Sequence, residues 1–345
     1  MMSSDLMKQA VLMGPHNMQV EMAPVPAPAS GEILLKVHRL GICGSDTHFY
    51  EHDTGVVEYP LIQGHEMSGE VADANGSAKL KNGDKVIVIP STFCGVCDDC
   101  KAGHTQWCKD NKIAGVFSPG MAREYVSFPE RMVLKVPEDM SYDVAAAIEP
   151  FAVALHACEI SGSLEGKNVL VLGAGVVGNM AAQIANTMNA KKVVLAGRKQ
   201  YRMDFAKQVG INNTIDTDKQ DLTEGVMAQF GELPDVVIDF IGVGDSLNIA
   251  IKLCRKGGAV IMSGIYGEFM PTDLFTVQDR EIRLIGTMTY TLEDFHKSIA
   301  LVSSDKVCLT PLVTDHFTLD TYNEAYNYMA AKSTPYMKVM VDIAD

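Results

Sequence analysis

Four cysteines crowd into one short stretch of the chain, between residues 94 and 108. They follow the pattern C-x2-C-x2-C-x7-C and are Cys94, Cys97, Cys100 and Cys108. Thiolates at this spacing can converge on one tetrahedral cation, and four sulfurs close its coordination shell. Because a closed shell has no position for a substrate, the pattern predicts a structural zinc rather than a catalytic one.

Three other interpretations of these cysteines have less support. The first six residues lack the basic patch and apolar run of a secretory signal, so we expect a cytoplasmic protein with reduced thiols rather than disulfides. Four tightly spaced thiols also exceed what a redox pair needs. A DNA-reading zinc module needs basic neighbours, whereas Asp98, Asp99 and Asp110 lie beside these cysteines.

A glycine pattern suited to a dinucleotide lies in the middle of the chain. The apolar run 168–172 leads into G-x-G-x-x-G at Gly173, Gly175 and Gly178, and a helical stretch over 179–189 follows. In this strand–turn–helix context Gly173 permits the tight turn, Gly175 lets a pyrophosphate approach the backbone, and Gly178 lets helix and strand pack closely. The helix N-terminus offers N–H groups and a positive dipole end to the phosphates. The pattern therefore predicts an NAD(P) site rather than a simple tight turn.

The end of the next expected strand, 192–196, bears on the choice of coenzyme. An NAD-preferring fold usually carries an acidic residue about 20 positions after the glycines, to bind the ribose hydroxyls. This chain instead has Gly197, Arg198, Lys199 and Arg202 in this region. Without a carboxylate a 2′-phosphate is not repelled, and Arg198 with Lys199 or Arg202 can pair with it. We therefore predict an NADP preference; the alternative is a solvated basic start to the next helix, with NAD still accepted.

A third group of residues mixes sulfur, imidazole and carboxylate donors. Cys43 lies in a Cys-Gly-Ser-Asp-Thr-His sequence, His65 and Glu66 lie in Gly-His-Glu, and Glu149 precedes a proline. A lone cysteine is most often a small core residue, so none of these motifs identifies a site alone. Together with the four cysteines, the Gly-Asp-Lys-Val turn at 83–86 and the glycine pattern, they resemble the zinc-dependent medium-chain alcohol and polyol dehydrogenases over essentially the whole chain. The sorbitol and threonine dehydrogenase branch is the most similar, and residues 43–52 are especially similar to sorbitol dehydrogenases.

The resemblance implies a catalytic zinc held by Cys43, His65 and Glu66, with Glu149 either binding the zinc or hydrogen-bonding its water. Three mixed ligands leave a fourth position open, where zinc acts as a Lewis acid on a substrate hydroxyl. Ser45 and His48 match the family's proton relay, for which a helix-capping serine and a surface histidine are the alternatives. We expect further contacts with the coenzyme at Val177, Gly197, Gly264, Ile265 and Met288.

The substrate is less narrowly defined than the reaction. The resemblance implies hydride transfer between NAD(P) and a secondary alcohol of a polyol or related sugar-derived substrate. Sorbitol dehydrogenases carry Arg-Tyr where this chain has Thr289 and Tyr290, and a tyrosine where it has Phe49, so the reaction class is implied more firmly than sorbitol itself. The alternatives are a threonine- or diol-type zinc dehydrogenase, a zinc-free nucleotide-binding reductase, and a non-enzymatic zinc protein.

Two different architectures must position these residues. Before about residue 141 the sequence is rich in strands and turns, with strands expected at 32–37 and 85–89. A helical stretch over 145–158, broken by Pro150, comes next. Apolar runs then alternate with helical patterns, which predicts βαβ units and a parallel sheet; the runs are 168–172, 192–196, 235–240, 259–264 and 282–286.

The expected fold class is therefore α/β, with two domains. The resemblance implies a GroES-like, β-rich catalytic domain over 1–152 with its zinc lobe at 90–110. A Rossmann coenzyme domain with a doubly wound parallel sheet follows over 153–292, and residues 293–345 return to the catalytic domain. Family members with such a zinc lobe are usually homo-dimers or homo-tetramers.

Bulk properties agree with two globular domains and exclude some functions. The 345 residues exceed what one hydrophobic core usually serves. Apolar residues make up 47% and charged residues 21%, which is ordinary for a globular protein. The net charge of -14 opposes nucleic-acid binding. The chain has no apolar run of about 18 residues, so we expect no membrane span.

Overall fold

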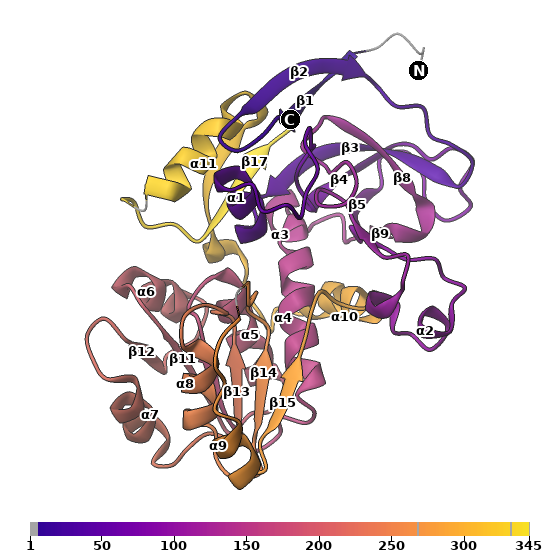
Figure 1. The fold of residues 1–345 in the computed structure, drawn as a ribbon. Helices are drawn as coiled ribbons and strands as arrows, with labels where there is room; N and C mark the ends of the chain where they lie inside the picture. The colour runs from indigo at the N-terminus through magenta and orange to yellow at the C-terminus, as the bar shows by residue number, and fades with distance from the viewer. Residues whose placement is uncertain (1–5, 268, 332, 345) are drawn as a thin grey trace. The chain divides into compact units, whose positions relative to one another are not determined.

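The structure is a computed structural model, and it describes residues 6–267, 269–331 and 333–344. The chain divides into two compact units, drawn with their elements in Figure 1. The first unit comprises the residues up to Glu149, Thr291–Ile299 and the residues from Val313 onward, and the second comprises Pro150–Tyr290 and Ala300–Leu312. Within the described residues, no helix has the length and apolar character needed to cross a membrane.

A seven-stranded sheet forms the core of the first unit. Its order is β16-β17-β3-β4-β5-β9, with β8 paired to β3, and only β16 and β17 run parallel. The strands are β3 (Glu32–Gly41), β4 (Glu66–Asp73), β5 (Lys85–Val88), β8 (Tyr125–Pro129), β9 (Val133–Lys135), β16 (Val313–Thr318) and β17 (Lys338–Asp342). Neighbouring strands cover β3 along its length, and seven of its ten residues are buried, which places the apolar core around it.

Short elements complete the first unit. Two separate antiparallel pairs are β1 (Leu6–Leu12) with β2 (Met18–Pro24), and β6 (Ser91–Thr92) with β7 (Lys112–Ile113). The helices are α1 (Gly44–Glu51), α2 (Asp98–Lys101), α3 (Tyr142–Ala146) and α11 (Tyr322–Ala331), with 3-10 turns at Thr105–Trp107, Glu130–Met132 and Leu319–Thr321. Two more helices, α4 (Ile148–Ile160) and α10 (Leu292–Val302), cross the boundary between the units.

A six-stranded parallel sheet forms the second unit, in the order β12-β11-β10-β13-β14-β15. The strands are β10 (Asn168–Leu172), β11 (Lys192–Gly197), β12 (Thr214–Asp216), β13 (Val236–Asp239), β14 (Ala259–Met262) and β15 (Arg283–Gly286). The helices between them are α5 (Val176–Thr187), α6 (Gln200–Gln208), α7 (Leu222–Phe230), α8 (Ser246–Leu253) and α9 (Leu274–Asp279). All five residues of β10 are buried, as expected for a strand covered on both faces. This strand order is that of a doubly wound dinucleotide fold, whose ligand site lies where the order reverses, beside β10. The predicted α/β class is confirmed.

The helical stretch around Pro150 differs from the sequence expectation. The chain interrupts the helix at Ala147, between α3 and α4, and Pro150 lies in the first turn of α4. A proline is tolerated there because the first N–H groups of a helix have no partner within it. The prediction that Pro150 breaks the helix was therefore wrong.

The C-terminal segment also differs from the expected boundaries. Residues 300–312 cluster with the second unit, although the whole of 293–345 was expected to return to the first domain. The side chain of Gln183, on α5, binds the segment 300–312 to the second unit. It accepts the backbone N–H of Cys308 at 2.7 Å and donates to the Cys308 carbonyl oxygen at 3.2 Å. The return to the first unit therefore takes place in two pieces.

Candidate active site

The pairing of β3 with β4 brings Cys43, His65 and Glu66 together. In this register Gly41, at the end of β3, faces Glu66, at the start of β4. Cys43 follows Gly41 by two residues as the N-cap of α1, and His65 directly precedes β4. One ligand atom from each of Cys43, His65 and Glu66 lies within 4.8 Å of the others. A Cβ atom at Gly41 would overlap the Glu66 carboxylate, so this glycine leaves room for the third donor.

Asp46 supports both arms of this group from within α1. One of its carboxylate oxygens, Oδ2, accepts the backbone N–H of Cys43 at 3.1 Å. The other, Oδ1, lies 3.8 Å from Nδ1 of His65. Asp46 is fully buried and His65 is 6% exposed, so Asp46 acts on both residues away from solvent.

The third donor has a strong partner at the far end of the chain. Nζ of Lys338, on β17, donates to both carboxylate oxygens of Glu66, at 2.8 and 2.6 Å, and to the carbonyl oxygen of Ile42 at 3.0 Å. Both side chains are buried. Burial lowers the pKa of Lys338, but the charges of Glu66 and Cys43 outweigh it and leave the pKa raised. Lys338 is therefore a cation that competes with any metal for Glu66.

The electrostatic environment of His65 favours a positive charge at this place. Burial lowers the pKa of His65, but the negative charges of Asp46 and Cys43 oppose it and the pKa stands well above its ordinary value. A buried imidazole, a thiol and a carboxylate in this environment fit a zinc ion, which prefers such mixed donors and releases their protons on binding.

The other predicted catalytic residues lie near this group but outside it. Glu149 is 8% exposed on α4, and its negative charge acts on both His65 and Lys338. Ser45 and His48 lie one turn apart on α1. His48 is exposed, and its ring meets that of His52 edge-on at 5.3 Å. The structure therefore brings three of the predicted donors together and places Glu149 at their side.

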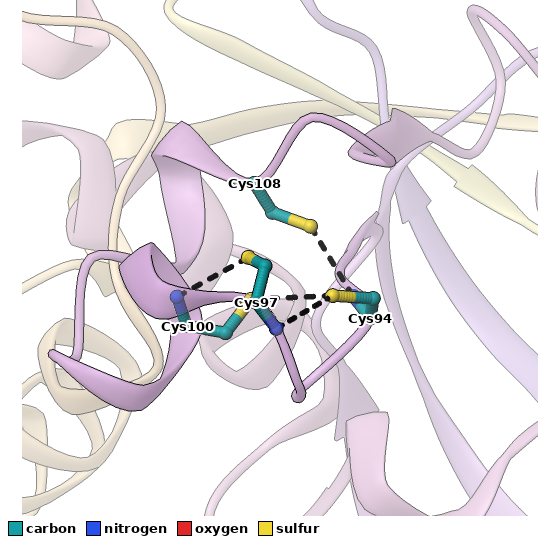
Figure 2. Close-up of side chains that lie close together, drawn as sticks. All are labelled: Cys94, Cys97, Cys100 and Cys108. Atoms are coloured by element: carbon teal, nitrogen blue, oxygen red, sulfur yellow. Dashed lines mark hydrogen bonds between the residues drawn. The ribbon is translucent and has the colours of Figure 1, made fainter.

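The four cysteines converge in a separate lobe, as Figure 2 shows. Backbone N–H groups of Val96 and Cys97 donate to Sγ of Cys94 at 3.4 and 3.3 Å, and these bonds lower its pKa to about 6. Sγ of Cys94 lies 3.9 Å from Sγ of Cys100, and tetrahedral zinc with its usual bond lengths to sulfur requires about 3.8 Å. The lobe therefore fits a structural zinc.

The glycine loop of the second unit has the geometry that the sequence predicts. Gly173 has a φ of +103° and follows β10 directly. A Cβ atom at Gly178 would overlap the carbonyl oxygen of Gly173, so only glycine permits this helix–strand contact. Nδ2 of buried Asn179 donates to the carbonyl oxygens of Ala174 and Gly175, at 3.2 and 2.9 Å. Gly175 caps α5 without a side chain, which leaves the first N–H groups of the helix open to an anion.

Comparisons with known proteins identify the family. Residues 29–138 match the family model described as the alcohol dehydrogenase GroES-like domain, and residues 176–304 match the one described as zinc-binding dehydrogenase. A sorbitol dehydrogenase from Bacillus subtilis is 32% identical over 97% of this chain and 97% of its own length. The chain belongs to the zinc-dependent medium-chain dehydrogenases. It is an enzyme of the alcohol and polyol dehydrogenase type.

Solved structures similar to this dehydrogenase carry either coenzyme. A zinc-binding dehydrogenase from Sinorhizobium meliloti bound to NADP is 28% identical, covers 98% of this chain and 100% of its own, and has a TM-score of 0.88. An alcohol dehydrogenase from Escherichia coli in complex with NADH is 27% identical, with the same coverage and a TM-score of 0.91. The relatives therefore support a nicotinamide coenzyme without deciding between its two forms.

The remaining coenzyme residues predicted for the dehydrogenase surround the carboxyl ends of its parallel strands. Gly197 ends β11 and lies so close to Ala174 that a Cβ atom would clash. Arg198 is exposed just beyond it, and Nη1 of Arg202 lies 3.3 Å from the position that a Cβ atom would take at Gly175. The others are Val177 in the first turn of α5, Gly264 and Ile265 after β14, and Met288 after β15. Ile265 and Met288 are 63% and 65% exposed.

A cavity in the first unit of the dehydrogenase lies apart from the predicted ligands. It has a volume of about 500 Å³ and is lined by residues of β1, β2 and the loops 56–62 and 116–119. Phe117, on one of these loops, is 54% exposed. The candidate active site is therefore defined by its donor atoms and not by this cavity.

Sequence analysis missed three residues that support the site. Asp46 belongs to the Cys-Gly-Ser-Asp motif but was given no role, and Gln63 precedes the Gly-His-Glu motif. Lys338 is the single charge in the apolar run 337–341. A charge within a buried apolar run requires a partner, and this was the one signal that pointed to Lys338.

Proposed function

We propose that this dehydrogenase transfers a hydride between NAD(P) and a secondary alcohol of a polyol or related sugar-derived substrate. The observation that carries the proposal is the convergence of Cys43, His65 and Glu66 within 4.8 Å. A set of sulfur, nitrogen and oxygen donors suits a catalytic zinc with an open position, whereas the four-sulfur lobe does not.

In this proposal Cys43, His65 and Glu66 hold the zinc. The ion supplies Lewis acidity toward the substrate hydroxyl, and the nicotinamide supplies the hydride acceptor. Because Lys338 donates to both oxygens of Glu66, this carboxylate would be shared between Lys338 and the ion, and Glu149 would bind the ion or hydrogen-bond its water. Ser45 receives the hydroxyl proton and passes it toward His48, whose exposed ring reaches solvent.

The substrate class rests on relatives rather than on contacts. Proteins 29% and 32% identical to this chain over 97% of its length are sorbitol dehydrogenases. At the two positions where the sequence departs from sorbitol dehydrogenases, Phe49 is buried at 7% exposure and Thr289 is half-buried. A polyol other than sorbitol is therefore the preferred expectation, with threonine- and diol-type substrates as the alternatives.

An absorbance assay of coenzyme reduction tests the reaction and the substrate class together. Purified enzyme is offered polyols, sugar acids, diols and threonine, each with NAD+ and with NADP+. Turnover of at least one secondary alcohol of a polyol is expected, and it should disappear when the metal is stripped. Turnover of threonine or a diol alone would replace the polyol assignment, and metal-independent turnover would refute the zinc mechanism.

We further propose that NADP is preferred. Arg198 directly follows β11 and Arg202 lies in the first turn of α6, and the segment 196–203 contains no acidic residue; a guanidinium pairs well with a 2′-phosphate. Arg198→Gln is expected to raise KM for NADP+ by about 10-fold and to change KM for NAD+ little. Lys207→Gln is the control, because Lys207 is an exposed cation of the neighbouring helix α6 whose ion pair within the described residues is with Asp204. A wild-type preference for NAD+ would refute this assignment.

A homo-oligomer is the proposed assembly. β15 is one of the two edge strands of the parallel sheet, and none of its four residues is buried. Leu274 and Phe275 on α9 are 64% and 78% exposed. An open edge with apolar neighbours favours pairing with another chain. Sedimentation analysis is expected to find a dimer or tetramer, and a monomer at micromolar concentration would contradict it.

The proposed location is the cytoplasm. The structure joins none of the eight cysteines in a disulfide, as expected of a reducing compartment. A fusion to a fluorescent protein, imaged in its own cells, would show whether the enzyme remains there.

A further inference from the structure

Gln63 is a fully buried polar side chain with both ends of its amide bonded. Its Nε2 donates to the backbone carbonyl oxygen of Asp46 at 3.1 Å, and its Oε1 accepts the hydroxyl of Tyr326 at 2.7 Å. A buried amide that lacks such partners is costly, so these two bonds define one orientation of the side chain. The proposed reaction assigns no role to either Gln63 or Tyr326.

The amide joins the two chain segments that carry the proposed metal ligands. Gln63 lies two residues before His65, on the segment that leads into β4. Asp46, which accepts its N–H, lies in the first turn of α1, directly after Cys43. The hydrogen bond from Gln63 therefore spans from the His65 segment to the Cys43 segment.

Tyr326 fixes the other end of the amide from α11. Its ring is fully buried, stacks on Tyr50 of α1 with 4.3 Å between centroids, and stacks on Tyr322 at 5.1 Å. Rings held on two sides cannot change rotamer without disturbing the core. The hydroxyl of Tyr326 is therefore held where it selects which end of the Gln63 amide faces Asp46.

We propose that Tyr326 and Gln63 are a positioning pair that sets the separation of Cys43 and His65, and so the affinity of the catalytic metal site. This inference rests on the proposed function, because it takes Cys43 and His65 as the zinc ligands. It adds that α11, more than 250 residues further along the chain, belongs to the framework of that site. Partners that orient metal ligands typically change metal affinity by about 10- to 100-fold when they are removed.

Tyr326→Phe tests the pair, because it removes the hydroxyl and keeps the ring. Zinc release from the holoenzyme to excess pyridine-2,6-dicarboxylate is followed with time, and the two sites are expected to give two phases. The catalytic phase should accelerate by about 10-fold or more, while the phase of the cysteine lobe stays unchanged. With cobalt in the catalytic site, the visible absorption bands should also shift, because they report ligand geometry.

Tyr50→Phe is the matched control. Tyr50 is equally buried and stacked, and its hydroxyl donates to Oδ1 of Asn323 at 2.8 Å, so it also links α1 to α11. Among the described residues Tyr50 makes no hydrogen bond to Gln63, so removal of its hydroxyl should leave the catalytic zinc phase at the wild-type rate. Equal acceleration in Tyr50→Phe and Tyr326→Phe would overturn the inference, since general packing would then explain both.

Two further variants keep the test decisive. Gln63→Leu replaces the amide with an apolar side chain of similar volume and should accelerate the same phase. It provides the test if Tyr326→Phe does not fold. If a folded Tyr326→Phe or Gln63→Leu protein releases its catalytic zinc at the wild-type rate and its cobalt bands do not shift, the positioning role is refuted. Cys43→Ala separates this result from failure of the proposed function: if that variant keeps both release phases, the assignment of Cys43 as a ligand is wrong, whatever Tyr326 does.

Discussion

The cysteine lobe and the candidate active site of this dehydrogenase are built in opposite ways. The cysteine lobe takes all four sulfurs from residues 94–108, and backbone N–H groups of the same loop hold them. The candidate active site takes its donors from the ends of two strands, and its supporting residues come from α1, α11 and β17. The lobe is a local structure, whereas the active site exists only when the whole first unit is assembled.

This difference follows from what each site must do. A closed shell of four thiolates needs only the correct loop. A catalytic site must leave one coordination position of its metal without a protein ligand. Residues outside the coordination shell therefore have to fix the positions of the ligands. Asp46, Gln63 and Lys338 are those means here, and each is buried. The variants below would break or sharpen this contrast.

Cys43→Ala should have the largest effect on activity. Loss of a ligand should lower turnover by more than about 100-fold, beyond the effect of losing an outer partner. Zinc content should fall from about two ions per chain to about one, while coenzyme still quenches or shifts the protein fluorescence. Cys308→Ala, at an exposed cysteine, should change neither quantity. Substantial turnover in Cys43→Ala would show that the open site lies elsewhere.

Lys338→Met should have the largest effect on stability. Removing one partner of a buried ion pair typically costs about 3–5 kcal/mol of unfolding free energy, and Glu66 would remain buried and unpaired. The pKa of Lys338 is raised, so the pair stabilises the fold fully below the ordinary lysine value of 10.5 and loses its effect only above it. Urea unfolding at neutral pH therefore measures the whole contribution.

The control for this variant is Lys8→Met. Lys8 also pairs with a carboxylate, Asp320, at 2.6 Å, but both side chains are exposed. Exposed pairs contribute little, so its unfolding curve should overlay that of the wild type. Similar curves for Lys338→Met and Lys8→Met would remove Lys338 from the framework of the active site.

Cys97→Ser should have the smallest effect on chemistry. It should lose the lobe zinc and leave most of the initial turnover, because the lobe shares no ligand with the active site. Trp107, the only tryptophan of the chain, is 58% exposed in the lobe and stacks on His104 at 4.2 Å. Its fluorescence should change in Cys97→Ser and remain unchanged in Cys43→Ala. Immediate loss of turnover in Cys97→Ser would mean that the two regions are coupled.

The sequence predicted best what is encoded locally. The lobe cysteines, the strand 168–172 and the glycine pattern each lie within a short stretch of consecutive residues. The structure contains all three as expected. The two-domain α/β class was predicted for the same reason, since the change from strand-rich to alternating texture is visible along the sequence.

What the sequence did not predict depends on long-range contacts. Gln63 meets Tyr326 across 263 positions, and Glu66 meets Lys338 across 272. No periodicity carries such pairings. Local patterns also misled at Pro150, because a proline that breaks a helix interior is harmless in its first turn. The excursion of residues 300–312 to the second unit depends on Gln183, which no motif marks.

The position of Lys338 on the last strand has a consequence for how the enzyme folds during its synthesis. While the chain emerges from the ribosome, its cysteine lobe can capture metal as soon as residues 94–108 are free. Glu66, by contrast, cannot form its ion pair until Lys338 has been synthesised, 272 residues later. The four cysteines of the lobe can therefore converge while the chain is still being made, whereas the proposed catalytic site is complete only once β17 has been added.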